Sequence, residues 1–246
     1  MAGRPSLSAA LAAVLVSVAV FGPTQASTLR VSPVGLDLPV GQNATTLSLF
    51  NDDVAPLNVQ IRVFRWKQVE GKDVLEPATD VVASPPIAKV SPGAARTVRV
   101  VRLDAKLPEK QESYRLIVDE LPPPLSEGGR QVTLLMRHSI PLFFAAGTDK
   151  AKVAWRLTWS QDTPMLTASN TGGHHLRLSN LRIVDGSGAV LAERKGLVGY
   201  ALPGATMAWP TGAFAQSAGQ AARQAAGLHL VADTDTGPID APLAGD

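Results

Sequence analysis

The clearest alternation of apolar and polar positions lies in residues 130–144, RQVTLLMRHSIPLFF. Val132, Leu134 and Met136 fall on one parity, whereas the positions between them mix polar and apolar side chains. Successive side chains of a strand point to opposite faces, so one face of this predicted strand carries a row of bulky apolar groups. Such a row is an aggregation risk at a sheet edge. It also suits a protein that lends a strand to another protein's incomplete fold.

The same period of two recurs along most of the chain and predicts many short strands. The expected strands are 29–38, 44–50, 57–66, 96–103, 113–120, 131–145, 152–159, 164–169, 176–184 and 189–194. Turn residues separate them, as in NDD at 51–53 and DGSG at 185–188. Regular short strands with such turns favour an all-β chain of sandwiches, although turn spacing alone does not distinguish a sandwich from a barrel.

A domain boundary is expected near residues 147–150, GTDK. Enough strands for a seven-stranded sandwich precede it, and a smaller set follows. The predicted domains are therefore 27–147, which contains the strand 131–145, and 148–232. Residues 233–246 are acidic, contain Gly and Pro, and have no strand or helix pattern, so we expect a disordered tail.

The first 26 residues resemble a secretory signal. Arg4 is their only charged residue, residues 9–21 are mostly apolar, and Thr24-Gln25-Ala26 ends like a cleavage site. The apolar run is too short for a spanning helix, so cleavage near Ala26 and an exported chain without stable membrane insertion are expected. An uncleaved membrane anchor is the alternative.

Composition excludes several classes of protein. Of 23 basic residues one is Arg4, which leaves 22 against 21 acidic residues, so no strong net field would attract nucleic acid. The chain has no cysteine, which excludes disulfides, a thiol nucleophile and cysteine zinc sites. About 220 residues after the signal suffice for two domains that rely on their cores alone.

Several segments, taken in order, resemble the periplasmic pilus-assembly chaperones of the PapD-like family. They are VSPVGLDLPVGQ (31–42), LSLFNDD (47–53), PPIAKVSPGAARTVRV (85–100), ESYRLIVDELPPP (112–124), TLLMRHSIPLFF (133–144), LTASNTGGHHLRLSNL (166–181) and GLVGYALPGATMAW (196–209). The most specific element is Glu-Leu-Pro-Pro, a loop and then the long alternating strand. The pattern RxSxPxF at 137–143 is more similar to the archaic or spore-coat-U-type branch than to the adhesive-pilus branch.

The resemblance implies two immunoglobulin-like β-sandwich domains set at an angle around a cleft. It also implies a periplasmic chaperone that fills the open groove of pilus subunits with its own strand and delivers them to an outer-membrane usher. By position, the inserted residues are Val132, Leu134 and Met136, with Ile140 as a further member of the row. Burying such a side chain contributes about 1.5–3 kcal/mol.

In the adhesive-pilus branch of the family, two basic residues in the cleft between the domains bind the subunit's terminal carboxylate, but the matching positions here are Gly35 and Pro141. Arg115 and Arg137 lie on strands that should be neighbours in the sheet, so we expect both guanidinium groups to reach one site near the interdomain cleft and to form this anchor. Arg30 is a third candidate. The alternative is that these are ordinary exposed strand arginines.

No residue pattern predicts a cofactor, a metal site or an enzyme. His174 and His175 lie in an Asn-Thr-Gly-Gly turn, and adjacent residues of a strand point apart, so a surface turn is expected rather than a shared metal. His138 and Ser139 are likewise adjacent and cannot form a hydrolase triad together. The remaining alternative is a structural or adhesive cell-surface protein with immunoglobulin-like domains, which would more often carry repeats, an anchor or disulfides.

Overall fold

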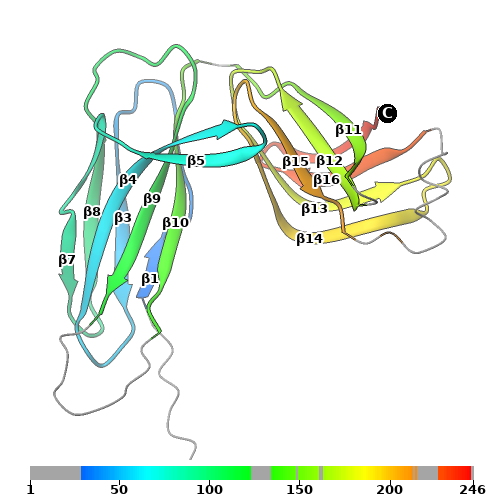
Figure 1. Cartoon of the computed structure of the whole chain (residues 1–246). Coiled ribbons are helices and arrows are strands. Elements are labelled where there is room, and N and C mark those ends of the chain that lie inside the picture. Colours follow the sequence, from blue (N-terminus) through cyan, green and yellow to red (C-terminus); the bar gives the residue numbers. More distant parts are fainter. Residues whose placement is uncertain are drawn as a thin grey trace, which may run out of the picture.

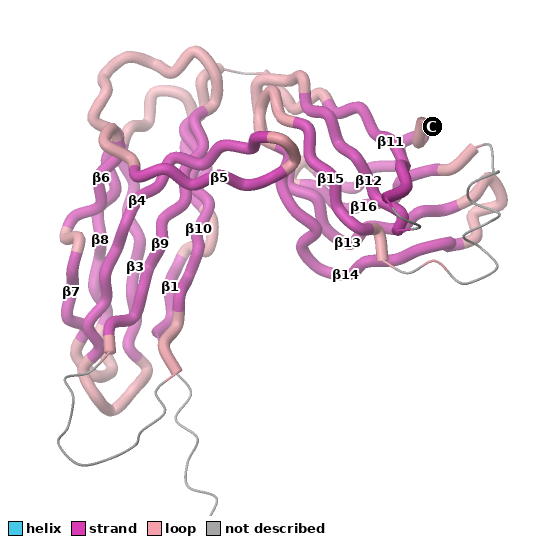
Figure 2. The backbone as a smooth tube through the Cα atoms, in the orientation of Figure 1, coloured by secondary structure: helices cyan, strands magenta, loops and turns pink. Residues whose placement is uncertain are grey.

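The computed structural model describes residues 29–122, 134–147, 149–160, 163–212, 214 and 227–244. The predicted signal sequence 1–26 and Val132 lie outside these residues. The described chain consists of strands joined by loops and turns (Figure 2). No helix of the described residues is long and apolar enough to cross a membrane.

Ten strands build the first sandwich. They are β1 (Leu29–Ser32), β2 (Leu36–Leu38), β3 (Ala44–Asn51), β4 (Leu57–Val69), β5 (Lys72–Pro77), β6 (Val81–Ser84), β7 (Ile87–Val90), β8 (Ala95–Arg102), β9 (Glu112–Leu121) and β10 (Arg137–Phe144). One sheet has the order β1-β3-β8-β6, and the other has the order β2-β10-β9-β4-β5, with β7 also paired to β4.

The predicted strand 29–38 is two strands that belong to different sheets. β1 pairs with β3, whereas β2 runs parallel to β10 in the facing sheet. The residues between them include Pro33, which has no backbone N–H to donate to a ladder, and Gly35. The chain therefore leaves one sheet at this point and joins the other.

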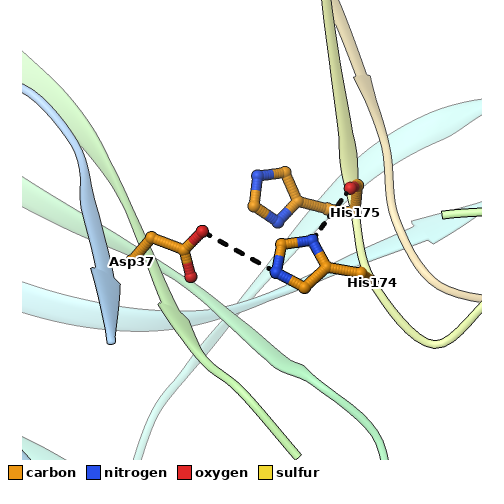
Figure 3. A group of neighbouring side chains, drawn as sticks. All are labelled: Asp37, His174 and His175. Atoms are coloured by element: carbon orange, nitrogen blue, oxygen red, sulfur yellow. Dashed lines mark hydrogen bonds and ion pairs between the residues drawn. The ribbon is translucent and has the colours of Figure 1, made fainter. Parts of the chain in front are cut away.

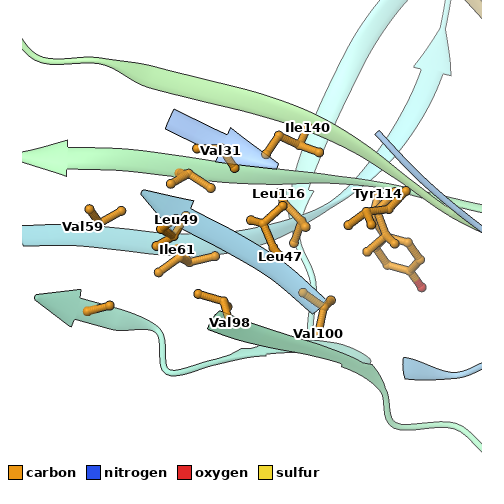
Figure 4. Close-up of a cluster of buried hydrophobic side chains, with 14 of the residues drawn as sticks. Val31, Leu47, Leu49, Val59, Ile61, Val98, Val100, Tyr114, Leu116 and Ile140 are labelled. Atoms are coloured by element: carbon orange, nitrogen blue, oxygen red, sulfur yellow. The ribbon is translucent and has the colours of Figure 1, made fainter. Parts of the chain in front are cut away.

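Alternating inward side chains from both sheets fill the first core (Figure 4). Leu47 and Leu49 of β3, Val98 of β8 and Leu116 of β9 are completely buried in it. At 25 cal/mol per Å², burial of such side chains is the main source of stability for a domain without disulfides. Because the chain has no cysteine, the first domain depends on this core for its stability.

Seven strands build the second sandwich. They are β11 (Val153–Ser160), β12 (Thr163–Asn170), β13 (Leu176–Val184), β14 (Val190–Ala201), β15 (Thr206–Pro210), β16 (His229–Thr234) and β17 (Gly237–Pro242). Their sheets have the orders β11-β12-β15 and β14-β13-β16-β17. Strands on either side of residues 145–152 belong to different sheets, and the two sandwiches meet at an angle (Figure 1).

The expectation of a disordered tail at 233–246 is wrong for most of that segment. β16 continues to Thr234, and β17 pairs with it over residues 237–242 as a hairpin. The strand pattern is weak because β17 lies at a sheet edge, where half of its side chains are exposed and Pro238 and Pro242 are tolerated. The second domain therefore extends ten residues beyond the predicted end at 232.

Candidate functional site

Strand β10 is covered unevenly along its two edges. Its inner edge pairs with β9 over its whole length, from Arg137 opposite Asp119 to Phe144 opposite Glu112. Its outer edge pairs with β2 only at residues 142–144. Among the described strands, none pairs with the outer edge of residues 137–141, so the backbone groups of that edge are open to another chain.

The residues that lead into β10 expose apolar side chains. Leu134 is 72% exposed and Met136 is 44% exposed, and they share a parity. Continuing the register beyond Arg137 would place Leu135 opposite Leu121, the last residue of β9. Leu134 therefore lies past the end of its neighbouring strand, which explains why its side chain is free.

Ile140 does not belong to this exposed row. It is 3% exposed and packs in the first core, opposite Leu116 of β9. It points to the same face of the strand as Leu134 and Met136, but at its position the facing sheet covers that face. Its assignment as an inserted residue is therefore wrong, and the row ends before it.

Arg137 forms a cross-strand cluster with an acid rather than standing free. Its Nε donates to Asp119 Oδ1, and Arg62 Nη2 lies 2.5 Å from Asp119 Oδ2. Burial alone would raise the pKa of Asp119, but the hydrogen bonds from Arg137 and Arg62 outweigh it and the pKa is lowered. Two arginines thus share one carboxylate on the outer face of the sheet.

Arg115 lies four positions away from Arg137 in the register, opposite Pro141. Both arginines share a face of the sheet, but four residues of strand separate them by roughly 13 Å. The expectation that their guanidinium groups meet at one site is therefore wrong. A Cβ built on Gly35 would lie 3.7 Å from Pro141 Cγ, so the two positions that lack a basic residue do adjoin each other.

The guanidinium of Arg115 lies at the domain junction. Its Cζ is 3.7 Å from the centroid of the Trp66 ring and 5.3 Å from that of Tyr200, which belongs to the second domain. Within the described part of the chain, it has no ion pair or hydrogen-bond partner. Burial lowers its pKa, while the nearby charge of Asp73 and the Tyr200 hydroxyl act in the opposite direction. It lines a junction pocket of about 460 Å³.

Arg30 is engaged elsewhere. Its guanidinium forms two hydrogen bonds with Asp52, at 2.9 and 3.0 Å, and lies over the ring of Phe50. Both side chains of the pair are about half exposed. Of the three predicted anchor arginines, Arg30 and Arg137 are thus paired with acids, whereas Arg115 is stacked on aromatic rings and has no acid partner among the described residues.

The two domains contact each other through the side-chain amide of Gln68 and an apolar cluster. Gln68 at the end of β4 donates to the Tyr200 carbonyl at 2.8 Å and accepts from the Leu202 N–H at 2.9 Å. Trp66 and Phe143 of the first domain pack with Leu202 and Ala205 of the second. These contacts join the far end of β10 to the second domain.

The expectation of a surface turn at His174-His175 is wrong for His175. This residue is 4% exposed, and its ring stacks on Phe143 of β10 at 3.6 Å between centroids. Its backbone N–H and its Nδ1 both lie within 2.9 Å of Gln111 Oε1 in the first domain. The parity argument failed because both histidines precede β13 instead of lying within it.

The fold and the open strand define a class of protein: two β-sandwiches at an angle, with an uncovered strand edge in the first. Residues 28–146 match the family described as pili and flagellar-assembly chaperone, PapD N-terminal domain. The first domain therefore belongs to this family, and the comparisons together support a PapD-like chaperone. Comparison with curated proteins gives no match.

Solved structures cover almost the whole chain. A chain of the CsuC-CsuE chaperone-tip adhesion subunit pre-assembly complex, from archaic chaperone-usher Csu pili of Acinetobacter baumannii, is 25% identical, with a TM-score of 0.66 over 89% of this chain and 100% of that chain. The E. coli chaperone DraB is 20% identical, with a TM-score of 0.60 over 89% and 98%. A chain of the Salmonella enterica SafA pilin in complex with the SafB chaperone is 18% identical, with a TM-score of 0.61 over 89% of this chain and 98% of that chain. The similarity to these last two structures shows that they share the fold of this chain.

Proposed function

We propose that this chain binds pilus subunits by donor-strand complementation and delivers them to an outer-membrane usher. The observation that carries the proposal is the open outer edge of β10, together with the exposed apolar side chains of Leu134 and Met136 just before it. An open edge supplies main-chain hydrogen bonds, and side chains of one parity supply specificity for the groove. The family match and the 25% identity to a chain of an archaic chaperone–subunit complex point to the same activity.

Leu134 and Met136 are the proposed inserted residues, with Val132 as the next member of the row by parity. Each such side chain contributes about 1.5–3 kcal/mol on burial, before the entropic cost of association. A chaperone must later release its subunit, so this moderate sum fits the role. A structural or adhesive cell-surface protein is not favoured, because neither the family match nor the structural matches point to one.

Arg115 is the proposed anchor for the subunit's terminal carboxylate. It lies opposite Pro141, where the basic residue of the adhesive-pilus branch is missing, and its guanidinium is partly desolvated at the domain junction. A fixed anchor sets the register of the donated strand, and a slip of one residue would turn the apolar row to the wrong face. Arginine can bind a carboxylate through two parallel hydrogen bonds.

Chaperones of this family work in the periplasm, and we propose the same compartment here. The residues that support it are the predicted signal at 1–26, with cleavage near Ala26. The usher is the proposed recipient of the subunit, because a capped subunit must leave the chaperone to assemble.

The test is capture of a candidate subunit co-expressed in a bacterial periplasm, measured as a one-to-one complex by size-exclusion chromatography. Leu134→Glu should abolish the complex, because a carboxylate cannot enter an apolar groove without a partner. Val190→Glu is the matched control, since Val190 is 53% exposed on the second domain. The proposal would be overturned if Leu134→Glu, folded like the parent by circular dichroism, captured the subunit as well as Val190→Glu.

A further inference from the structure

A cluster of two histidines and two aspartates lies at the domain junction, outside the proposed subunit site. Asp37, His174 and His175 each offer one ligand atom, and these three atoms lie within 4.8 Å of one another (Figure 3). Asp37 lies on β2 of the first domain, and the histidines lie just before β13 of the second. Asp235, in the turn between β16 and β17, approaches His175, with its Oδ2 3.8 Å from His175 Nε2.

The hydrogen-bond partners determine which nitrogen of each ring carries the proton. His174 Nδ1 lies 3.1 Å from the His175 carbonyl oxygen, which can only accept, so Nδ1 is the donor. His175 Nδ1 lies 2.9 Å from Gln111 Oε1, an oxygen that also accepts the His175 backbone N–H. Nδ1 is again the donor. In both neutral rings Nε2 therefore carries the lone pair.

Both lone pairs face carboxylate oxygens. His174 Nε2 lies 3.7 Å from Asp37 Oδ2, and His175 Nε2 lies 3.8 Å from Asp235 Oδ2. Two acceptors held opposite each other are stabilised by a cation placed between them. Arg177, whose charge also acts on His175, has an exposed side chain that can turn toward solvent.

We propose that His174, His175 and Asp37 bind a Zn²⁺ ion that bridges the two domains, with the carboxylate of Asp235 beside it as the fourth ligand. Neutral imidazole nitrogen and carboxylate oxygen are common zinc ligands, at about 2.0–2.2 Å. The Nδ1–H groups held by carbonyl oxygens match the outer contacts that orient zinc-binding histidines. The ligand atoms must draw together by about an ångström to reach tetrahedral spacing. Asp37 and His174 are partly exposed and free to make this adjustment.

The ion would fix the angle between the domains, because its ligands come from both. The proposal does not depend on subunit capture, and its test uses zinc alone. Isothermal titration of the complete mature chain with ZnCl₂ should give one ion per chain. His174→Ala and Asp37→Ala should each weaken binding by about tenfold or more. Both side chains are more exposed than His175, so these variants should keep their fold.

His229→Ala is the matched control. His229 Nδ1 lies 2.8 Å from Asp240 Oδ1 on the β16–β17 hairpin, so it offers a histidine–carboxylate pair of the same chemistry at another place. Its replacement should leave zinc affinity unchanged. Absorption of the Co²⁺-loaded chain should show the intense visible bands of a four-coordinate site, and these bands should vanish in His174→Ala.

Several results would overturn the proposal. One is a parent chain that binds no zinc or binds it no more tightly than His174→Ala. Another is a loss of binding in His229→Ala. If His174→Ala lost the ion while Asp37→Ala kept it, zinc would bind the second domain alone, and the bridge between domains would be wrong.

Discussion

The two halves of segment 134–144 follow the same alternation but end in different surroundings. In the second half, Ile140 and Phe144 are buried between the sheets, together with residues of β1 and β3. In the first half, Leu134 and Met136 have the same parity and remain exposed. Between them His138 Nε2 lies 3.1 Å from the carbonyl of Leu29, the first residue of β1. The cover of the facing sheet ends where β1 begins.

This difference shows what an apolar row can and cannot indicate. Alternation identifies side chains that share a face, because the strand period is a local property. Whether another strand covers that face depends on residues far away in the sequence. The free half of the row is therefore available to a partner, while the covered half holds the domain together.

The largest effect should come from the covered half. Phe144→Ala removes a ring that is 2% exposed and meets Tyr114 edge-on at 5.8 Å. We expect a loss of about 3–5 kcal/mol in the free energy of unfolding, measured by urea titration. Leu134→Ala is the control and should change it by about 0.5 kcal/mol at most. Equal losses in the two variants would contradict the division of the segment.

The second effect concerns the arginine beside the covered half. Arg115→Met removes the charge but keeps an unbranched apolar stem over Trp66. Because the free guanidinium is desolvated without an acid partner, stability should be unchanged or should rise. Subunit capture should weaken by about 2–5 kcal/mol if a carboxylate pairs with Arg115 in the complex. Titration of purified chaperone with a subunit, by competition, measures the difference. Unchanged capture would exclude Arg115 as the anchor.

The third effect belongs to the free half. Leu134→Ala should weaken subunit capture by about 1.5–3 kcal/mol, the worth of one buried side chain, in the same competition assay. The Leu134→Ala, Met136→Ala double variant should lose more, with little change in stability. Val190→Ala is the matched control on the second domain. A loss of capture in Val190→Ala equal to that in Leu134→Ala would mean that the two surfaces are not distinct.

Much of the fold could be predicted because its strands bury one face. β3, β8 and β13 carry clear alternation, and their predicted ranges match within about two residues. Six strands were not among the predicted ranges: β5, β6, β7, β15, β16 and β17. Of these, β5 is mostly exposed and β17 is half exposed, so their sequences carry little apolar alternation. The family resemblance could also be predicted, since its motifs are short and local.

The domain junction could not be predicted in the same way. His175 and Gln111 are 64 residues apart in the chain, and no local pattern links a turn histidine to a glutamine before a strand. Arg115 and Arg137 were expected to converge because neighbouring strands were known but their register was not. Register depends on the whole sheet, and here it separates the pair by four residues.

The smallest effect should come from Arg137, the arginine of the free half. Arg137→Ala removes an ion pair whose arginine is 66% exposed, so stability at neutral pH should fall by about 1 kcal/mol at most.

In this variant the pKa of Asp119 should rise, because burial raises it and only Arg62 would remain to lower it. A lowered carboxyl pKa stabilises the fold above the ordinary value near 3.8 and loses that contribution as the pH falls. Parent and variant should therefore differ at pH 7 and converge below pH 4, as measured by urea unfolding with carbon NMR titration of Asp119. Subunit capture by the variant should stay near that of the parent, because the Arg137 guanidinium is already paired with Asp119. A loss of capture as large as that of Arg115→Met would move the anchor from the covered half of the segment to the free half.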